Sequence, residues 1–458
     1  MHRSLSKLTV TLSLASLLTA CANIAPERHD YQSEAGSITQ DAQQQVENLE
    51  LSGLQQTVLL TDLMQSQELS SLVEQALTAN PSLQKSRLAV ESSTWSARQA
   101  GAGQLPTASA SLSATEDDGT STTYKAGINV SWEIDIWQRL ADSNAAADVS
   151  LAMEKLTYDG ARASLVGNVM KRWLGLVAAN RAHAIQQQRL ALLEKNENLI
   201  IARYRNGLGT LSGLDNARTQ TSQAKATLAE YAEEIAIQER ALALLLGRNS
   251  LSEPIVAAAY PLVILPIVAL PEQNLEQRPD VQAARLAIKA ADLNADATFK
   301  NRLPSFSLSA ALNDSGTSFS DALFVSPIWS LVAQLSAPIY EGGKRKAQSE
   351  IANIAVAQRY QEYRDTLLTA VNEINNSVGQ EKVLSARIGH TTSAIATAES
   401  DLRLTEQQYR SGLSSLTDLI SAQQTLFDLQ AQLDTLHYQQ LSNRIDLGLA
   451  LGLGIAQS

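Results

Sequence analysis

Hydrophobic positions recur with a helical period along two long stretches without proline, residues 140–206 and 344–411. In the second stretch the period is seven residues, and the segment that follows keeps this spacing. The repeating positions are Ile388, Ile395, Leu402 and Tyr409, then Leu419, Leu426 and Leu433. Sustained heptads are typical of coiled coils, and at 1.5 Å per residue each stretch predicts a rod of roughly 100 Å. Gly207 and Gly412 follow the rods, so the pattern predicts two antiparallel helical hairpins with glycine-bearing tips.

In four shorter segments the period changes to two, because serine, threonine and other polar residues alternate with apolar ones. These segments are 107–114, 124–136, 305–312 and 329–339. The polar segments 115–123 and 313–328 predict the tips that join them in pairs. Strands of about ten residues with one apolar face suit an outer membrane, with lipid on one side and water on the other. A half-buried soluble sheet packed on a helix would show the same alternation, so both alternatives stay open at this point.

The membrane alternative has a consequence for the number of chains. Four strands cannot close on themselves, and open edges would leave backbone groups unpaired in hydrocarbon. Three chains would together supply twelve strands, an even number of suitable size. The membrane alternative therefore predicts a trimer.

The chain is internally duplicated. The segment from Asn80 to Val90 returns as the segment from Arg278 to Ile288, at an offset of 198 residues. The run Tyr204-Arg205-Asn206-Gly207-Leu208 matches Tyr409-Arg410-Ser411-Gly412-Leu413, now at an offset of 205. The second half therefore carries seven extra residues between Pro304 and Tyr409. Two halves with one architecture are more typical of a conduit than of a single active site.

The N-terminus resembles a bacterial lipoprotein signal. Arg3 and Lys7 precede a short apolar run, and Leu18-Thr19-Ala20 then precedes Cys21, the single cysteine of the chain. This pattern predicts export and lipidation of Cys21, the alternative being an ordinary signal peptide with a chance cysteine. The predicted divisions are a signal peptide (1–20), a lipid-anchored extended segment (21–67), a first repeat (68–247), a proline-rich equatorial linker (248–276), a second repeat (277–452) and a tail (453–458).

Composition excludes several classes of function. Removing Arg3 and Lys7 with the signal leaves 34 basic residues against 47 acidic ones, a net charge of −13 that argues against nucleic acid as a partner. The five histidines have no ligand spacing, so no metal site is predicted. No Ser-His-Asp or Cys-His grouping can be proposed, so an enzyme is the least supported class. No cofactor is expected beyond the covalent lipid on Cys21.

Taken together, these motifs resemble the TolC family of outer-membrane efflux channels. The quoted motifs are the lipobox, the two segments that begin Asn80-Pro81 and Arg278-Pro279, the Leu-Pro strand starts and the paired tips. The run from Glu276 to Val281 and the lipidation signal are most similar to the lipoprotein, NodT-like branch of exit ducts for RND pumps. The resemblance covers residues 68–452.

The resemblance implies a fold, a location and partners. The fold is an α+β membrane protein, a trimer whose twelve-strand β-barrel in the outer membrane continues as a twelve-helix α-barrel of coiled-coil hairpins in the periplasm. The implied function is passive export of drugs or other toxic small molecules, delivered by an inner-membrane RND-type transporter and a periplasmic adaptor. One alternative is the exit duct of a type I protein secretion system. Another is a periplasmic adaptor or structural coiled-coil lipoprotein, although four lipid-type strands fit that class poorly.

In the family the hairpin tips meet the adaptor and close the channel. The residues that the resemblance assigns to this gate are Arg203, Arg205, Gly207, Asp215, Arg410, Gly412 and Asp418. Asp418 aligns with the constriction aspartate of the family, but Ser421 stands where some members carry a second one. Asp418 and Asp215 could instead simply favour the start of the returning helix. Trp132 and Trp329 are the strand residues expected at a membrane interface.

Overall fold

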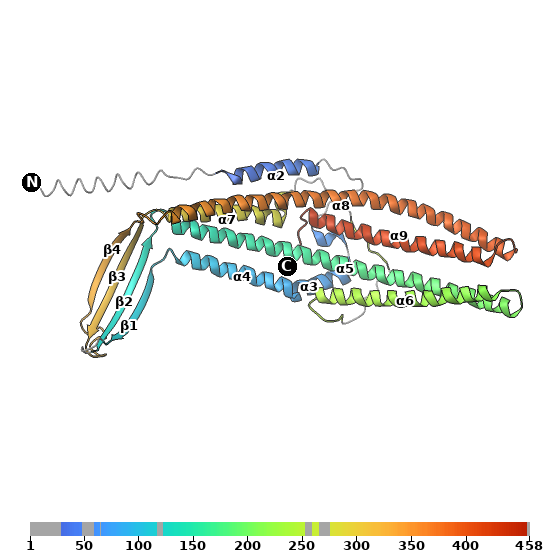
Figure 1. The fold of residues 1–458 in the computed structure, drawn as a ribbon, viewed down its shortest axis with the longest axis horizontal. Helices are drawn as coiled ribbons and strands as arrows, with labels where there is room; N and C mark the ends of the chain where they lie inside the picture. The colour runs from blue at the N-terminus through green and yellow to red at the C-terminus, as the bar shows by residue number, and fades with distance from the viewer. Residues whose placement is uncertain are drawn as a thin grey trace, which may run out of the picture. The chain divides into compact units, whose positions relative to one another are not determined.

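The computed structural model describes residues 29–47, 59–64, 66–116, 122–251, 259–264 and 275–455 (Figure 1). The signal peptide and Cys21 lie outside the described residues. The chain forms two compact units, each built from three segments. The strand unit comprises Met1–Ile38, Ala89–Leu156 and Val281–Thr366, and the hairpin unit comprises Thr39–Leu88, Thr157–Asp280 and Leu367–Ser458.

The strand unit contains a four-stranded antiparallel sheet in the order β1-β2-β3-β4. The strands are β1 (Thr107–Thr115), β2 (Thr123–Ile134), β3 (Ser305–Gly316) and β4 (Ile328–Ser336). All four predicted strands are therefore present. Their alternating serine and apolar residues suit a pleated surface in which successive side chains point to opposite faces.

Three predicted strand ends differ from the structure by more than one residue. β3 continues to Gly316, through residues predicted as a tip, because Gly316 still pairs with Tyr124 of β2. β2 ends at Ile134, and Ile136 lies in a turn that leads to Gln138, whose φ is +60°. β4 ends at Ser336, which leaves Ile339 outside the sheet. Pro338 lies between them and cannot donate a ladder hydrogen bond.

Two helices of equal length precede the strand pairs. α4 (Pro81–Ala102) and α7 (Pro279–Lys300) each span 22 residues. Both begin with proline, whose fixed φ and missing N–H suit the first helical position. Asn80 caps α4, because its Oδ1 accepts a hydrogen bond from the Leu83 amide at 3.0 Å.

The long rods form as predicted, to within one residue. α5 (Arg139–Arg205) and α8 (Lys344–Arg410) each span 67 residues. They are followed by α6 (Leu211–Leu245) and α9 (Leu416–Ala450), each of 35 residues, so both hairpins have the same dimensions (Figure 1). β3 starts 198 residues after β1, whereas α8 starts 205 residues after α5. The seven extra residues of the second half therefore lie between the starts of β3 and α8.

The predicted heptad seam is visible in the burial of α8 and α9. Ile388, Ile395, Leu402 and Tyr409 are half-buried, and Leu384, Thr391 and Thr405 at the intervening seam positions are buried. On α9, Leu419 is buried, and Leu426 and Leu433 are half-buried. This alternating spacing of three and four residues is the pattern expected for coiled-coil packing.

The apolar core of the hairpin unit lies around the middle of α5. Val169, Met170, Trp173 and Leu174 are buried there against α3 (Gln67–Ala79) and the end of α9. Gly448 of α9 lies in this core, where a Cβ atom would stand only 2.7 Å from Leu63 Cδ1. Larger side chains at this position would therefore displace the packed leucines.

The prediction of an extended N-terminal segment is wrong over part of its length. Residues Tyr31–Glu47 form helix α2. Ala35, Thr39, Ala42 and Val46 are buried on one face of this helix, at spacings of three and four residues. None of the described helices combines the length and apolar character needed to cross a bilayer.

Candidate functional site

The register of the sheet collects the apolar strand residues on one face. The matched rows run Ala108–Val130–Ala310–Leu331, Ala110–Ile128–Leu312–Trp329 and Trp132–Leu308–Ala333. The opposite face carries Ser109, Asn129 and Ala311 in one row and Ser131 beside Ser309 in another. The sheet is therefore strongly two-sided, as a strand with lipid on one side and water on the other requires.

The apolar face of the sheet is exposed. Trp329 is 76% exposed, Leu331 61% and Leu112 55%, and every residue of β1 and β4 is exposed. The soluble alternative requires this face to be covered, and within the described chain it is not. β1 and β4 are also the two edges of the sheet, so their outer backbone groups have no ladder partner among the described strands.

Trp132 and Trp329 both lie on the apolar face. Trp132 Nε1 donates a hydrogen bond to the carbonyl oxygen of Gln104 at 2.9 Å, near the helical end of the sheet. Trp132 is opposite Leu308 of β3, and Trp329 is opposite Leu312. Leu308 and Leu312 are four residues apart on β3, so the rows of the two tryptophans are about 13 Å apart along the strands. This distance is less than the apolar band of about 25 Å in an outer membrane. An interfacial role for either tryptophan stays a prediction.

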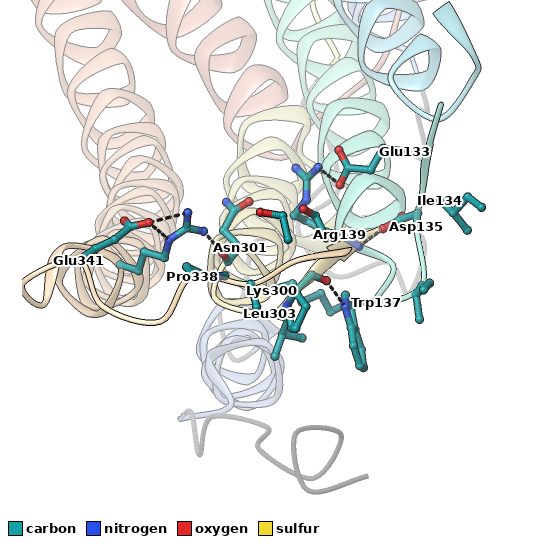
Figure 2. Close-up of a pocket in the computed structure, with 16 residues that line it drawn as sticks. Glu133, Ile134, Asp135, Trp137, Arg139, Lys300, Asn301, Leu303, Pro338 and Glu341 are labelled. Atoms are coloured by element: carbon teal, nitrogen blue, oxygen red, sulfur yellow. Dashed lines mark hydrogen bonds and ion pairs between the residues drawn. The ribbon is translucent and has the colours of Figure 1, made fainter. Parts of the chain in front are cut away.

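A polar junction joins the strand ends to the helices, around a cavity of about 350 Å³ (Figure 2). Asp135 caps α5, because its two carboxylate oxygens accept hydrogen bonds from the amides of Arg139 and Ala141, each at 2.8 Å. The Arg139 guanidinium pairs with Glu133 at 2.6 Å, and Trp137 Nε1 donates to the Pro304 carbonyl oxygen at 2.7 Å. Because these charges are paired with one another, we interpret the junction as a support for the exit angle of the helix.

Both hairpin tips close with a glycine turn, as the sequence predicts. Gly207 has φ +72° and Gly412 has φ +76°, a conformation that favours glycine. The amides of Leu208 and Leu413 donate hydrogen bonds back to the carbonyl oxygens of Arg203 and Gln408, at 2.9 and 2.8 Å. This bond pattern satisfies the last carbonyls of α5 and α8.

Asp418 forms a capping box with Ser415 at the start of α9. The Asp418 amide donates to Ser415 Oγ at 3.1 Å, and the Asp418 carboxylate accepts from the Ser415 amide at 2.9 Å. The hydrogen bonds from the Ser415 hydroxyl and amide and from Ser414 hold the pKa of the Asp418 carboxyl below its usual value. Asp418 therefore caps α9, and a part of Asp418 in the gate stays a prediction.

Asp215 has a different place in the fold. It lies beyond the cap of α6, which is Thr210, whose side chain accepts a hydrogen bond from the Gly213 amide at 3.1 Å. The offset of 205 makes Asp215 equivalent to Ile420, and Asp418 equivalent to Gly213. The two acids are thus not counterparts of each other in the duplicated structure.

The two tips meet at Arg203. Its Nη1 donates a hydrogen bond to the Tyr409 hydroxyl at 3.4 Å, which joins α5 to α8. Beside it, a cavity of about 350 Å³ is lined by Arg203, Leu208 and Thr210 of the first hairpin and by Leu416, Thr417 and Ile420 of the second. Arg205 and Arg410 are exposed and form no ion pair with a described residue. Of the predicted gate residues, only Arg203 therefore bridges the hairpins.

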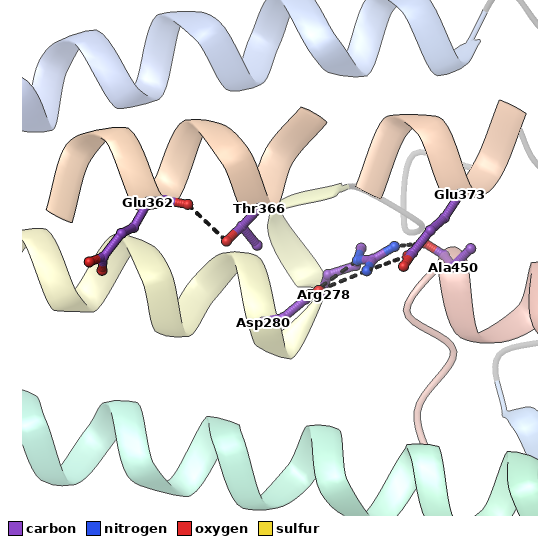
Figure 3. A network of polar contacts seen from close by, with 6 residues as sticks. All are labelled: Arg278, Asp280, Glu362, Thr366, Glu373 and Ala450. Atoms are coloured by element: carbon purple, nitrogen blue, oxygen red, sulfur yellow. Dashed lines mark hydrogen bonds and ion pairs between the residues drawn. The ribbon is translucent and has the colours of Figure 1, made fainter. Parts of the chain in front are cut away.

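Sequence reasoning missed a pair of anchors at the base of the hairpins. Arg278 Nη1 donates a hydrogen bond to the Ala450 carbonyl oxygen at 2.7 Å, and its guanidinium also pairs with Asp280 and Glu373 at 2.7 and 2.9 Å (Figure 3). Burial alone would lower the pKa of Arg278, but the hydrogen bonds and charges of Asp280 and Glu373 raise it above its ordinary value.

Asn80 makes the equivalent contact in the first repeat. Its Nδ2 donates to the Leu245 carbonyl oxygen at 2.9 Å. Asn80 and Arg278 are related by the offset of 198, and Leu245 and Ala450 by that of 205. The signal that could have found this pair was the repeated X-Pro motif itself, since one polar residue precedes proline in each copy. Each anchor ties the end of a returning helix to the start of α4 or α7.

Long helical hairpins joined to an edge-open sheet with an exposed apolar face define the class of outer-membrane duct proteins. Residues 72–248 and 270–453 match the outer membrane efflux protein family, and the chain belongs to it. It is therefore a transport protein of the cell outer membrane. The adaptor or scaffold alternative does not fit this family.

Known proteins of similar sequence and structure agree with this assignment. The probable outer membrane lipoprotein SilC of Salmonella typhimurium is 26% identical over 97% of this chain and 98% of its own length. The pyoverdine export outer membrane protein OpmQ of Pseudomonas putida is 26% identical over 75% of this chain and 73% of its own. The crystal structure of VceC from Vibrio cholerae covers 85% of this chain and 97% of its own, with a TM-score of 0.77 and 26% identity.

Proposed function

We propose that this chain is the trimeric exit duct of a tripartite efflux system, a passive channel without chemistry of its own. The observation that carries the trimer is the sheet, whose apolar face is exposed and whose outer strands β1 and β4 are edges. In hydrocarbon these edges must pair, and β1 of one copy can pair with β4 of the next. Three copies then close a twelve-strand β-barrel, continued by twelve helices of the α-barrel.

The proposed organisation keeps the divisions expected from the sequence. Cys21 carries a covalent lipid, no other cofactor is needed, and the repeats 68–247 and 277–452 each contribute one strand pair and one hairpin. The linker 248–276 lies between them. In this proposal Trp132 and Trp329 face lipid. The rings of Tyr124 and Phe319 contact each other towards the loop end of the sheet.

The partners in this proposal are a periplasmic adaptor at the hairpin tips and an inner-membrane RND-type transporter that supplies energy. The tip residues expected to meet the adaptor or form the gate are Arg203, Arg205, Gly207, Asp215, Arg410, Gly412 and Asp418. The cargo is a small molecule such as a drug or another toxic compound. The relative OpmQ is named for the export of pyoverdine, which supports a small-molecule cargo for this chain.

The native mass of the full-length protein, extracted from outer membranes in mild detergent, tests this proposal. We expect a species of three times the mass of the mature chain, plus lipid, that forms channels in planar bilayers. Substitution of Cys21 by serine is the matched control for the lipid anchor, because it removes the acylation site and leaves the strands unchanged. A stable monomer, or a protein released from membranes without detergent, would contradict the duct.

A further inference from the structure

The strands of the sheet contain very few charges. Lys125 and Glu133 on β2 and Asp314 on β3 are the charged residues within the four described strands. Asp314 is buried on the apolar face, where its carboxylate accepts hydrogen bonds from the Ser315 and Ser326 amides at 2.8 and 2.9 Å. Glu133 pairs with the Arg139 guanidinium at 2.6 Å. Two of the three strand charges are therefore already satisfied within the chain.

Lys125 is different, because it is exposed and forms no ion pair with any residue of the described ranges. The register places it on the polar face, directly opposite Ser113 of β1 and Ser315 of β3. Ser111 and Asn313 occupy the next row towards the helices, opposite Gly127. Lys125 is thus the one cation of the described strands, among small polar side chains, and the exposed Glu116 follows the end of β1. Its row lies close to the loop ends of β1 and β2, which are Thr115 and Thr123.

We propose that Lys125 determines the charge preference of the outer end of the duct. This inference rests on the proposed function, in which the polar face lines the lumen and the loop end faces the outside of the cell. Trimerisation then places three Lys125 side chains in one ring, and Glu133, the other strand charge on the polar face, is already paired with Arg139. The ring attracts small anions and anionic groups of solutes, although the mature chain as a whole is acidic with a net charge of −13.

Charged thiol reagents can measure the local potential beside Lys125 directly. Cys21 is the single natural cysteine, so Ser113→Cys introduces one reporter thiol opposite Lys125. The probes are two methanethiosulfonates, one carrying a sulfonate and one a trimethylammonium group, applied to the trimer in outer-membrane vesicles. The readout is the ratio of their reaction rates at the reporter, compared between Lys125 and the variants Lys125→Arg, Lys125→Gln and Lys125→Glu.

We expect the ratio of anionic to cationic reagent rates to follow the charge at position 125. It should be unchanged in Lys125→Arg, lower in Lys125→Gln, and lower by about fivefold or more in Lys125→Glu, since charges a few ångströms apart are little screened near 0.1 M salt. In 1 M salt the differences should shrink, because the Debye length falls to about 3 Å. If Lys125 had only a structural role, the ratio of reaction rates would neither follow the charge of the side chain at position 125 nor depend on salt in this way.

Controls separate this inference from the proposed function. Lys289→Glu, an exposed residue on α7, makes the same charge change outside the sheet and should leave the ratio unchanged. Leu112→Cys, on the apolar face, should resist both reagents, and Ser315→Cys replaces the reporter if Ser113→Cys assembles poorly. If the protein is a trimer but the ratio of reaction rates at the reporter does not change with the charge at position 125, the inference is overturned and the proposed function is unaffected. A protein that is monomeric in the native-mass experiment overturns both.

Discussion

At the scale of single residues, the duplication explains why polar side chains occupy buried places at the base of the hairpins. Asn80 and Arg278 both donate to the last-turn carbonyl oxygen of a returning helix, Leu245 or Ala450. The first anchor is a neutral amide, whereas the second is a guanidinium that also pairs with Asp280 and Glu373. Hydrogen bonds from charged groups are stronger than neutral ones. The second hairpin therefore has the stronger anchor.

Substitution of these anchors should reveal that asymmetry. Arg278→Ala leaves the Ala450 carbonyl without its donor and separates two carboxylates from their cation, which should lower stability by about 1–3 kcal/mol. Asn80→Ala removes a neutral bond and a helix cap, and should cost about 1 kcal/mol. Thermal unfolding followed by circular dichroism gives the comparison. Arg278→Lys is the control, because it keeps the positive charge but not the planar guanidinium. Its stability should lie between that of the original chain and that of Arg278→Ala. Equal losses for Arg278→Ala and Asn80→Ala would contradict the asymmetry.

The Asp418 capping box makes the second tip sensitive to acid. The hydrogen bonds from Ser415 lower the pKa of Asp418 in the folded chain relative to its ordinary value of 3.8. Because the pKa is lower in the folded chain, the cap stabilises the tip fully at any pH well above the ordinary pKa of Asp418. This stabilisation is lost as the pH falls through the pKa of the folded chain. Hydrogen exchange of the amides of residues 415–419, corrected for the intrinsic rate, should therefore accelerate below about pH 4. Asp418→Asn should remove this step, and persistence of the step in that variant would assign it to another group.

At the scale of elements, the sequence predicts the regular structure well and its ends less well. α5 and α8 follow the proline-free stretches to within one residue, because glycine turns end them and no internal residue interrupts them. The end of β3 and the existence of α2 were not predicted. Gly316 extends β3 because Tyr124 of β2 is available as a partner, and α2 is amphipathic over only a few turns. Both depend on tertiary partners that a local pattern does not contain.

The two faces of β4 should respond oppositely to an added charge. Leu331→Lys puts a cation on the exposed apolar face, and a lysine facing the middle of the lipid costs about 2–4 kcal/mol in an outer-membrane strand. Ser330→Lys changes the adjacent residue on the polar face and should be nearly neutral. Urea titration of the trimer in detergent-free vesicles measures the difference. Equal destabilisation by the two variants would mean that the sheet does not face lipid on its apolar side.

At the scale of the whole molecule, the proposed duct needs a part that closes it and a part that conducts. Within the hairpin unit, the Arg203–Tyr409 hydrogen bond joins the two tips at 3.4 Å, close to the limit for such a bond. Exposed contacts of this kind contribute little energy, which suits a gate that a partner must open. The sequence identified Arg203 among the tip residues through a family resemblance, but its partner Tyr409 could be recognised only once the two hairpins were placed together.

Removing the link between the tips should therefore favour the open duct. Tyr409→Phe deletes the acceptor hydroxyl and keeps the ring in the heptad seam, so the coiled coil should remain intact. We expect this variant and Arg203→Ala to raise the open probability of the channel in planar bilayers, by about twofold for a loss of some 0.4 kcal/mol of closing energy per trimer. Arg205→Ala, which removes an exposed charge with no described partner, is the matched control and should conduct like the original chain. If Arg203→Ala and Arg205→Ala opened the duct equally and Tyr409→Phe did not, tip charge rather than this contact would hold the duct closed. In the double variant Arg203→Ala/Tyr409→Phe the two effects should not add, because both substitutions remove the same contact.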